Sequence, residues 1–581
     1  MIIFYADSGW ELNLTNLKIT FIEENALFFD AFFKNYTLPF SLDLDEETSI
    51  KLGLIDEENI TNYTVKHEGK IFLDNKFDTA YLIIEVLEDG IEANISFGKI
   101  TIPLMDTPLS SLPFPLIKTS SIVNWATSIK NKVYPEVSHS FPMVFDDEFY
   151  KETNYDFFEG TINNFDGTNY IQNAIDGPTG DVHNKNAMVP FPFLMEILKV
   201  GFGSANMQMI GEFVNTKANN HIIIDPKKHL EKFSSTTYEN YQFSQTTEEY
   251  IDGDTLIFGY EKTHQISSIG SFSIKVLLNF PDEVTVRSLI IKRGSEEVYN
   301  ASGNSIDETI SINKESVFPT ETLTVKLEIE ATAIVVENYN NFEFEKSEGK
   351  LNVFQDTFSL SEFMPDMTFG SLLAKVKNWQ NLKVVLSDAY VRMDYVENKF
   401  TEVIFKDERA FEMKLPKREF NQSKLYKLQY DDDNYILIDK NGITTSIASF
   451  SEEDIIIIDM QLQVLPVENR GALFSAVRQN NDLFSILLYN GEDVNGYPVA
   501  VDKVEGFTFL LPEIVNLRWK NWLSFRLNSK IVTDEFTAHS LEEFLINEGR
   551  FKYNEKHLYK KIKRTRISEE EWEFEIESET F

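Results

Sequence analysis

The 581-residue sequence contains no cysteine. This absence excludes disulfides, thiolate zinc sites, iron–sulfur ligation by cysteine and cysteine nucleophiles. Glycine and proline are also few, with 25 and 18 residues, which excludes collagen-like and low-complexity chains. No apolar run approaches the roughly 18 residues of a membrane-spanning helix, and the start Met1–Asp7 lacks the basic segment of a secretion signal. We therefore expect a protein made in the cytoplasm, without membrane attachment.

Positive charge is scarce, because 54 Lys and Arg residues stand against 93 Asp and Glu residues and give a formal net charge of −39. Such a surface repels phosphate backbones and anionic lipid, so we expect no sequence-specific nucleic-acid binding. Aromatic residues are abundant, with 48 Phe, 23 Tyr and 6 Trp, and they fit the surfaces of sheets well. The composition predicts a mainly β protein, and its length predicts about four domains.

The first residues, 1–105, predict an N-terminal β domain. Apolar residues mostly alternate with polar ones over Trp10–Ile22, which is the period of a half-buried strand. A short helix is predicted over Asp45–Gly53, because an aspartate can cap its start and a glycine its end. Two later strand-like runs flank Asp89-Gly90, a pair typical of a hairpin turn.

Four further regions follow. Residues 106–245 are rich in Pro, Asn, Asp, Gly and Ser, which predicts long connections with one helix near 189–200. Residues 246–345 predict an inserted β-sandwich, because short strand-like runs recur between turns. Residues 346–425 predict a helix followed by a strand, and residues 426–581 a C-terminal β domain. The pattern after the second helix predicts almost only strands.

The two helices have recognisable ends. In the first, two prolines fit the first turn, and Gly201 and Gly203 are expected to end it. The second is predicted from about Thr368 to Asn378, capped by Asp366 or Thr368 and with apolar residues along one face.

The last hairpin pairs a basic strand with an acidic strand, and cross-strand charge pairs of this kind stabilise a sheet. Its basic members are Lys560, Lys561, Lys563, Arg564 and Arg566, and its turn is at 568–571. Alternation then predicts one apolar and one acidic face, formed by Trp572, Phe574 and Ile576 and by Glu573, Glu575 and Glu577.

Catalytic signatures are missing from the sequence. It contains no Gly-x-Ser-x-Gly, no His-Glu-x-x-His and no Walker A loop. Gly201-Phe202-Gly203 is the nearest approach to a dinucleotide loop, but Asn206 stands where the third glycine is needed, so a helix end is the favoured interpretation. Paired carboxylates for glycoside hydrolysis cannot be singled out among 93 acidic residues. The basic run 552–566 could contact nucleic acid, but an ion-paired hairpin is favoured.

Metal-ligand patterns are equally weak. His221 and His229 lie close together, but their spacing of eight does not match usual zinc sites. Asp431–Asn434 and Asp252–Asp254 offer oxygen ligands suited to Ca²⁺ without completing a twelve-residue calcium loop, so solvated turns are favoured. The other histidines are scattered, at 67, 139, 183, 264, 539 and 557. We expect no enzyme, no cofactor, and no catalytic, cofactor-binding or metal-binding residue.

Several segments together resemble tail proteins encoded by phages and prophages of Bacteroidetes-type bacteria. These segments are Ser8–Leu14, Tyr36–Leu42, Val189–Leu194 with its helix and the following Ile210–Phe213, Met364–Leu373, and Lys417–Asn421. The fourth, with the strand-like residues 381–385 after it, is similar to the helix-plus-strand unit of tail-hub, or baseplate-hub, proteins of tailed phages and contractile injection systems.

In that family, two related β-barrel domains build a trimeric ring between tail tube and spike. The resemblance therefore implies a β-barrel in residues 1–105, a hub-like unit in residues 346–425, and a homotrimer located in the virion tail. It also implies contacts with tail tube, distal-tail, spike or fibre, and tape-measure proteins. The module at 246–345 departs from the minimal hub pattern, so its role stays open.

Two other functions stay open on the sequence alone. A glycan-binding or glycan-cleaving virion protein would stack exposed Trp or Tyr rings on sugars. A distal-tail ring protein would share the β-barrel but differ in symmetry. The oligomeric mass distinguishes the hub from the distal-tail ring, since a trimer favours the hub and a hexamer favours the distal-tail ring.

Overall fold

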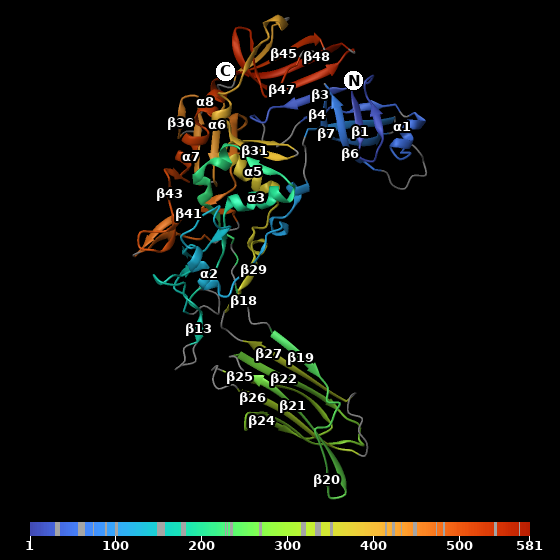
Figure 1. Ribbon diagram of the computed structural model, residues 1–581, viewed down its shortest axis with the longest axis vertical. Coiled ribbons are helices and arrows are strands. Elements are labelled where there is room, and N and C mark those ends of the chain that lie inside the picture. Colours follow the sequence, from blue (N-terminus) through green and yellow to red (C-terminus); the bar gives the residue numbers. More distant parts are fainter. Residues whose placement is uncertain are drawn as a thin grey trace.

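Figure 1 presents a computed structural model of the chain, which is mainly β, as the composition predicts. About half of the residues lie in strands and 17% in helices. The structure describes residues 1–581 except 29–34, 44, 56–63, 74, 88–89, 99–102, 148–156, 176–181, 227, 229–230, 233–235, 267–269, 315–320, 332–338, 349–352, 388, 413–414, 421–423, 432, 446–449, 472, 480–482, 540–542 and 569.

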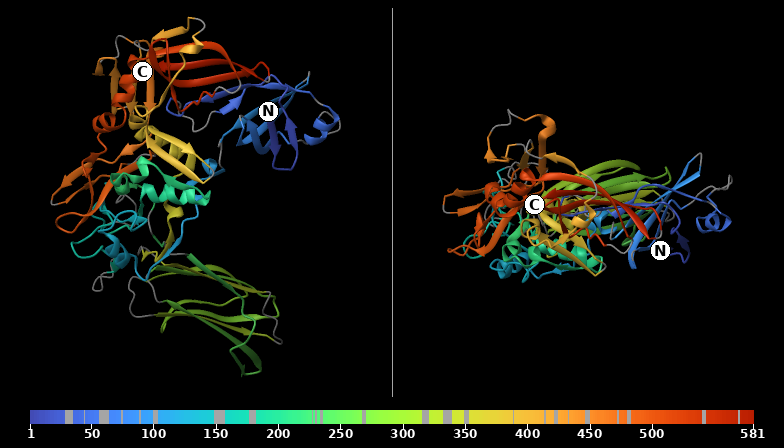
Figure 2. Two further views of the ribbon diagram at one scale, coloured as in Figure 1. Left: turned by 45° about the horizontal axis from the view of Figure 1, so that its top comes forward. Right: turned by 90° about the horizontal axis from the view of Figure 1, so that it is seen from above.

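The molecule is elongated, with a large sheet at one end, helices in the middle and a separate pair of sheets at the other end (Figure 1). Both termini lie at the end with the large sheet. Both views in Figure 2 place the blue N-terminal strands beside the red C-terminal strands, and the left view again shows the green sheets at the far end.

Among the described residues, the large sheet contains 14 strands, most of them from the two ends of the chain and two, β32 and β33, from residues 405–420. Its path runs β2-β1-β6-β7-β8-β4-β3-β47-β48-β45-β33, with β5, β32 and β46 attached beside it. The strands are β1 Ile3–Ala6, β2 Glu11–Asn13, β3 Thr20–Glu24, β4 Asn35–Thr37, β5 Phe40–Leu42, β6 Lys66–Leu73, β7 Lys76–Leu87, β8 Gly90–Phe97, β32 Phe405–Asp407, β33 Lys417–Phe420, β45 Lys530–His539, β46 Gly549–Lys552, β47 Glu555–Arg566 and β48 Glu571–Thr580.

This sheet corrects the expectation of an N-terminal barrel in residues 1–105. Among the described residues the path is open, with β2 at one edge and β33 at the other, and no closed barrel forms. Strand β3 pairs with β47, with Phe21 opposite Arg564, so strands of 1–105 and 426–581 share one sheet. The two regions also share one apolar core, in which Phe21 lies near Trp572. Their pairing brings together residues more than 500 positions apart, which local sequence patterns do not reveal.

Several N-terminal elements match their sequence signals. Helix α1, Glu46–Lys51, is capped by Asp45, whose Oδ1 accepts a hydrogen bond of 2.7 Å from the Thr48 N–H. Strands β7 and β8 form the predicted hairpin, with Leu87 opposite Gly90, although turn residues 88–89 lie outside the described part. The alternation over 10–22 is divided between β2 and β3 rather than forming one strand.

The middle of the molecule contains more helix than the sequence predicts. The helices are α2 Ile122–Ile129, α3 Leu194–Ser204, α4 Glu212–Asn215, α5 Phe369–Gln380, α6 Val396–Lys399, α7 Leu511–Arg518 and α8 Lys520–Asn528. Helix α2 lies in the region expected to form connections, and α7 and α8 lie where almost only strands were expected. Their apolar residues, among them Trp522 and Leu523, are buried in one core shared with α3 and α5. Tertiary packing therefore stabilises helices whose local signals are weak.

The start of α3 is also a correction. Pro192 belongs to the short strand β15, Phe191–Pro192, which pairs with β10, His139–Ser140. The helix begins only at Leu194, and Gly201 and Gly203 lie inside it rather than ending it. Helix α5 begins after Thr368, whose hydroxyl accepts a hydrogen bond from Ser371 N–H, as its sequence signal predicts.

Small sheets surround these helices. They contain β16 Gln208–Ile210, β30 Leu382–Leu386 and β31 Tyr390–Tyr395; β17 Ile222–Ile224, β38 Gln463–Val464, β41 Ser485–Glu492 and β42 Pro498–Val501; and β34 Leu425–Gln429, β35 Tyr435–Asp439, β36 Gly442–Thr444 and β37 Ile455–Asp459. Short two-stranded ribbons add β9 Leu116–Lys118, β11 Val144–Phe145, β12 Thr161–Ile162, β13 Ala174–Ile175, β14 Val182–His183, β29 Thr357–Ser359, β39 Val467–Arg470, β40 Leu473–Ala476, β43 Lys503–Val504 and β44 Phe507–Thr508.

The far end of the molecule is a β-sandwich. One sheet has the order β19-β27-β22-β25 and the other β20-β21-β26-β23-β24. Their bounds are β19 Thr236–Tyr241, β20 Glu248–Asp252, β21 Thr255–Ile266, β22 Gly270–Asn279, β23 Thr285–Arg293, β24 Glu296–Ala301, β25 Ser305–Lys314, β26 Glu321–Glu330 and β27 Asn340–Glu348. All described members of its core come from between Tyr241 and Phe344. The strands β18, Glu231–Lys232, and β28, Val353–Phe354, pair where the chain enters and leaves it.

Candidate functional site

Two segments that carry the sequence resemblance meet where α3 crosses α5. The Phe202 and Phe369 rings lie 4.9 Å apart, edge to face. Gly201 faces the same Phe369 ring so closely that a Cβ atom there would clash with it, whereas Gly203 faces open space. Gly370 similarly lies against the backbone of Met105. Glycine is therefore needed at Gly201 and Gly370 for close packing, not for a dinucleotide loop or a helix end.

The strand after α3 continues this unit. Strand β16 runs parallel to β31, with Ile210 opposite Arg392. Gly211 follows with a φ of 112°, a conformation that favours glycine. Glu212 N–H then donates a 2.9 Å hydrogen bond to the Asp394 side chain, and the Glu212 carboxylate lies 3.1 Å from Lys399 Nζ. Burial acts to raise the pKa of Glu212, but hydrogen bonds from Lys399, Asn398 and the backbone lower it overall.

Helix α7 contacts the same unit through Arg518, its last residue. The Arg518 guanidinium lies 3.5 Å from the centre of the Tyr395 ring, and its Nε donates to Gln380 Oε1 at 2.9 Å. Asn381 ends α5 in the left-handed conformation, and its side-chain amide donates to the Arg518 carbonyl at 2.7 Å. Burial lowers the pKa of Arg518. These polar groups connect α5, α7 and β31, so the arrangement fixes their relative positions.

A buried cluster of charges lies in the large sheet. Arg550 and Lys552 on β46 both pair with Asp534 on β45, the former at 2.6 Å. Glu408 accepts a hydrogen bond from the Tyr559 hydroxyl, and burial raises the pKa of the Glu408 carboxyl. All five side chains are buried. The two basic and two acidic groups balance one another, as buried charges must.

The basic strand β47 lies between two acidic strands. Lys563 lies 2.6 Å from Glu575 on β48, as the predicted hairpin requires. On its other side Arg564 lies 3.1 Å from Glu23, and Lys561 3.5 Å from Glu24, both on β3. The contact with β3 has no sequence signal, because it depends on long-range pairing. Residues 555–566 form the basic strand of the ion-paired hairpin favoured for the basic run, whereas Lys552 belongs to β46 and pairs with Asp534.

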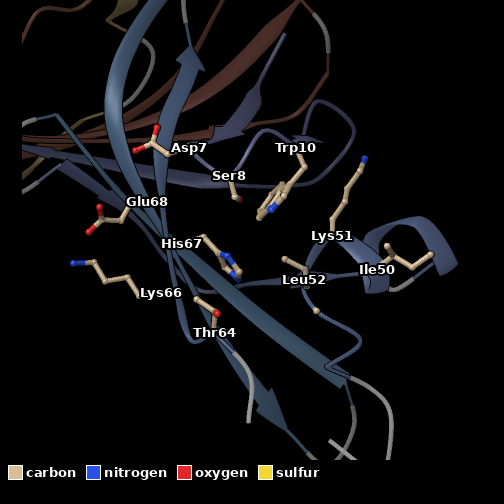
Figure 3. A pocket seen from close by; sticks show the side chains of 11 residues that line it. Asp7, Ser8, Trp10, Ile50, Lys51, Leu52, Thr64, Lys66, His67 and Glu68 are labelled. Atoms are coloured by element: carbon tan, nitrogen blue, oxygen red, sulfur yellow. The ribbon is translucent and has the colours of Figure 1, made fainter.

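A hollow of about 490 Å³ opens between α1, β6 and the turn before β2. The Trp10 and His67 rings lie 5.2 Å apart, edge to face, at its centre, and Asp7, Glu68 and Lys66 lie toward one side (Figure 3). Burial lowers the pKa of His67, which favours the neutral ring. The hollow presents the Trp10 indole, the His67 imidazole and side chains of both charges.

The described residues among the weak metal-ligand candidates lie in other structural contacts. His221 Nδ1 lies 3.1 Å from the Tyr489 carbonyl, and His229 lies outside the described residues. Asp431 accepts N–H groups of Asp433 and Asn434 at 3.0 and 2.8 Å, which makes a turn, and residue 432 is outside the described part. Within the residues that the structure describes, no three His, Asp or Glu side chains gather as metal ligands.

Asp252 of the second acidic loop and the remaining histidines are ion-paired, buried or placed in strands. Asp252 pairs with Arg287 at 2.7 Å. His139 is buried, accepts a hydrogen bond from Trp125 Nε1 at 3.3 Å, and has its pKa lowered to about 3 by burial. His557 is buried with its pKa lowered to about 4, chiefly by burial. The others lie in strands: His183 in β14, His264 in β21 and His539 in β45.

No helix in the described residues is long and apolar enough to span a membrane. No known protein family matches the sequence, and no curated protein matches it. Among solved structures, a chain from infectious bursal disease virus strain Gt has a TM-score of 0.13 and 12% identity, and the alignment covers 22% of this chain and 35% of that one. The chain thus spans about a third of that neighbour's length.

A second similar structure is the 43 kDa tail protein of prophage MuSo2 from Shewanella oneidensis. It has a TM-score of 0.18 and 8% identity, and the alignment covers 61% of this chain and 97% of that one. A chain from the Gx strain of infectious bursal disease virus has a TM-score of 0.13 and 8% identity over 60% and 56% of the two chains. TM-scores this low carry no argument about fold or function.

Proposed function

We propose that this protein is a structural component of a phage tail, specifically a tail-hub ring that links the tail tube to the spike or receptor-binding parts. The observation that supports the proposal is the placement of the five segments that resemble tail proteins, which lie in two parts of the molecule. Ser8–Leu14, Tyr36–Leu42 and the described part of Lys417–Asn421 lie in the large sheet. The other segments lie in the unit of α3, β16 and α5.

The charge supports the same role. A net charge of −39 per chain would repel DNA from the wall of an exit channel, so that DNA passes without adsorbing to it. In this proposal the chain is a homotrimer in the virion tail and acts by assembly, not catalysis. Its partners are the tail tube, distal-tail, spike or fibre, and tape-measure proteins.

Oligomeric mass and location test the proposal together. The purified full chain should sediment as a trimer, and an antibody against it should label the tail tip of intact virions in electron micrographs. A hexamer would overturn the hub in favour of a distal-tail ring. Release of reducing sugars from host polysaccharide, lost on changing a single Asp or Glu, would overturn the non-enzymatic role.

A further inference from the structure

Strand β37 forms an unusually apolar sheet edge. Its sheet has the order β36-β35-β34-β37, and β37 pairs only with β34 among the described strands. The strand reads Ile455-Ile456-Ile457-Ile458-Asp459, and Ile456 and Ile457 are 36% and 58% exposed. An uncovered edge of this kind is a template for pairing with another chain.

Two edge strands elsewhere in this protein carry charged residues. Strand β33, at the edge of the large sheet, carries Lys417, Arg418 and Glu419. Strand β20, at the edge of the sandwich, carries Glu248, Glu249 and Asp252 and is exposed throughout. Charged side chains within an edge strand discourage pairing with other chains. Strand β37 has no such charge across four consecutive residues.

Acidic residues instead flank the four isoleucines. Glu452 and Glu453 precede them and are exposed, and Asp459 follows them. Asp454 lies 3.7 Å from Lys424, so this acidic group already has a basic neighbour. An antiparallel second copy of β37 would place these acidic ends against each other, which is unfavourable. The net charge of −39 on each chain opposes such a dimer further.

We propose that β37 is a docking edge for an extended segment of another protein, with an apolar centre and Lys or Arg at both ends. The segment adds to the sheet as a further strand. Backbone hydrogen bonds hold it, its apolar residues cover Ile456 and Ile457, and its basic ends meet Glu452, Glu453 and Asp459. The inference concerns a surface distinct from the large sheet and does not depend on the proposed hub role.

A pair of peptides tests the charge requirement on the full chain. The probe is a fluorescent peptide of four consecutive Val residues flanked by two Lys at each end, so that both of its faces are apolar, and the control has Glu in place of each Lys. The Lys peptide should bind, with an affinity that falls as salt rises, and should slow amide hydrogen exchange in Ile455–Ile458. The Glu peptide should bind about tenfold more weakly or not at all.

Matched variants on opposite edges of one sheet test the location. Ile457→Thr should weaken binding of the Lys peptide by about tenfold, because an apolar contact is lost while strand propensity is kept. Ile443→Thr on β36 is the control, because Ile443 is 65% exposed and belongs to the other edge. It should leave binding unchanged.

Three results would overturn the proposal. The first is equal binding of both peptides, and the second is equal weakening by Ile457→Thr and Ile443→Thr. The third is a dimer of the full chain that Ile457→Thr dissociates, which would assign β37 to a second copy.

Discussion

Trp572 is expected to hold the N-terminal and C-terminal strands of the large sheet together. Its side chain is 5% exposed, its ring lies 5.9 Å from Phe21 on β3, and the Arg564 guanidinium lies 5.3 Å from it. Truncating a buried Trp to Ala costs about 3 to 5 kcal/mol. Trp572→Ala should therefore destabilise the junction between β3, β47 and β48.

Glu575 provides a matched control, because it lies on the same strand as Trp572 but on the opposite face of the sheet. Its pair with Lys563 is well formed at 2.6 Å, but the two side chains are 43% and 35% exposed. Solvent screens such a pair, so removing it costs roughly 0.2 to 1 kcal/mol. Glu575→Gln keeps the shape of the side chain and removes the charge.

Local hydrogen exchange and thermal melting together measure the difference. The chain has several cores, so exchange in strands β3 and β48 reports on this junction better than a single global melt does. A loss of 3 to 5 kcal/mol should lower the melting temperature of a unit of this kind by roughly 6 to 20 °C. Glu575→Gln should shift it by less than about 4 °C.

The opposite result would refute the assigned faces. If Glu575→Gln were as damaging as Trp572→Ala, the apolar and acidic faces of β48 would be exchanged. A shift of one residue in register has this consequence, because alternate side chains of a strand point to opposite faces.

Three further outcomes are expected. Residues 236–348 expressed alone should melt cooperatively in circular dichroism, because the described core of the sandwich is drawn from within this segment. Gly201→Ala should lower the free energy of unfolding by about 1 to 3 kcal/mol through its clash with the facing ring, and so lower the melting temperature. Gly203→Ala in the same helix should be neutral or stabilising by up to about 1 kcal/mol. Because burial lowers the pKa of His139 from 6.5 to about 3, its contribution to stability is complete above pH 6.5 and falls as the pH drops toward 3. The loss should be roughly 1.4 kcal/mol per pH unit and smaller in His139→Asn, as measured by urea unfolding across pH.

Each of these expectations can fail in a definite way. A random-coil spectrum of the isolated sandwich segment would show that it needs the rest of the chain. Equal effects of the two glycine changes would contradict the close crossing of α3 and α5. An unchanged pH dependence in His139→Asn would show that other groups control acid unfolding.

Sequence patterns were sufficient where the signal is local. The Asp45 cap of α1, the Thr368 cap of α5 and the alternating faces of β48 follow from a few neighbouring residues and the geometry of a helix or a strand. The net charge and the missing cysteines likewise follow from composition alone.

Only the tertiary structure decided which distant segments meet. The pairing of Phe21 with Arg564, the position of Gly201 against Phe369, and the buried cluster around Asp534 depend on contacts between residues far apart in the chain. Helices α7 and α8 form where the local pattern favoured strands, because packing of Trp522 and its neighbours into the shared core outweighs weak local preference. Local patterns determine strand faces and helix caps, whereas long-range packing determines whether a sheet closes or stays open, since that depends on which edges meet.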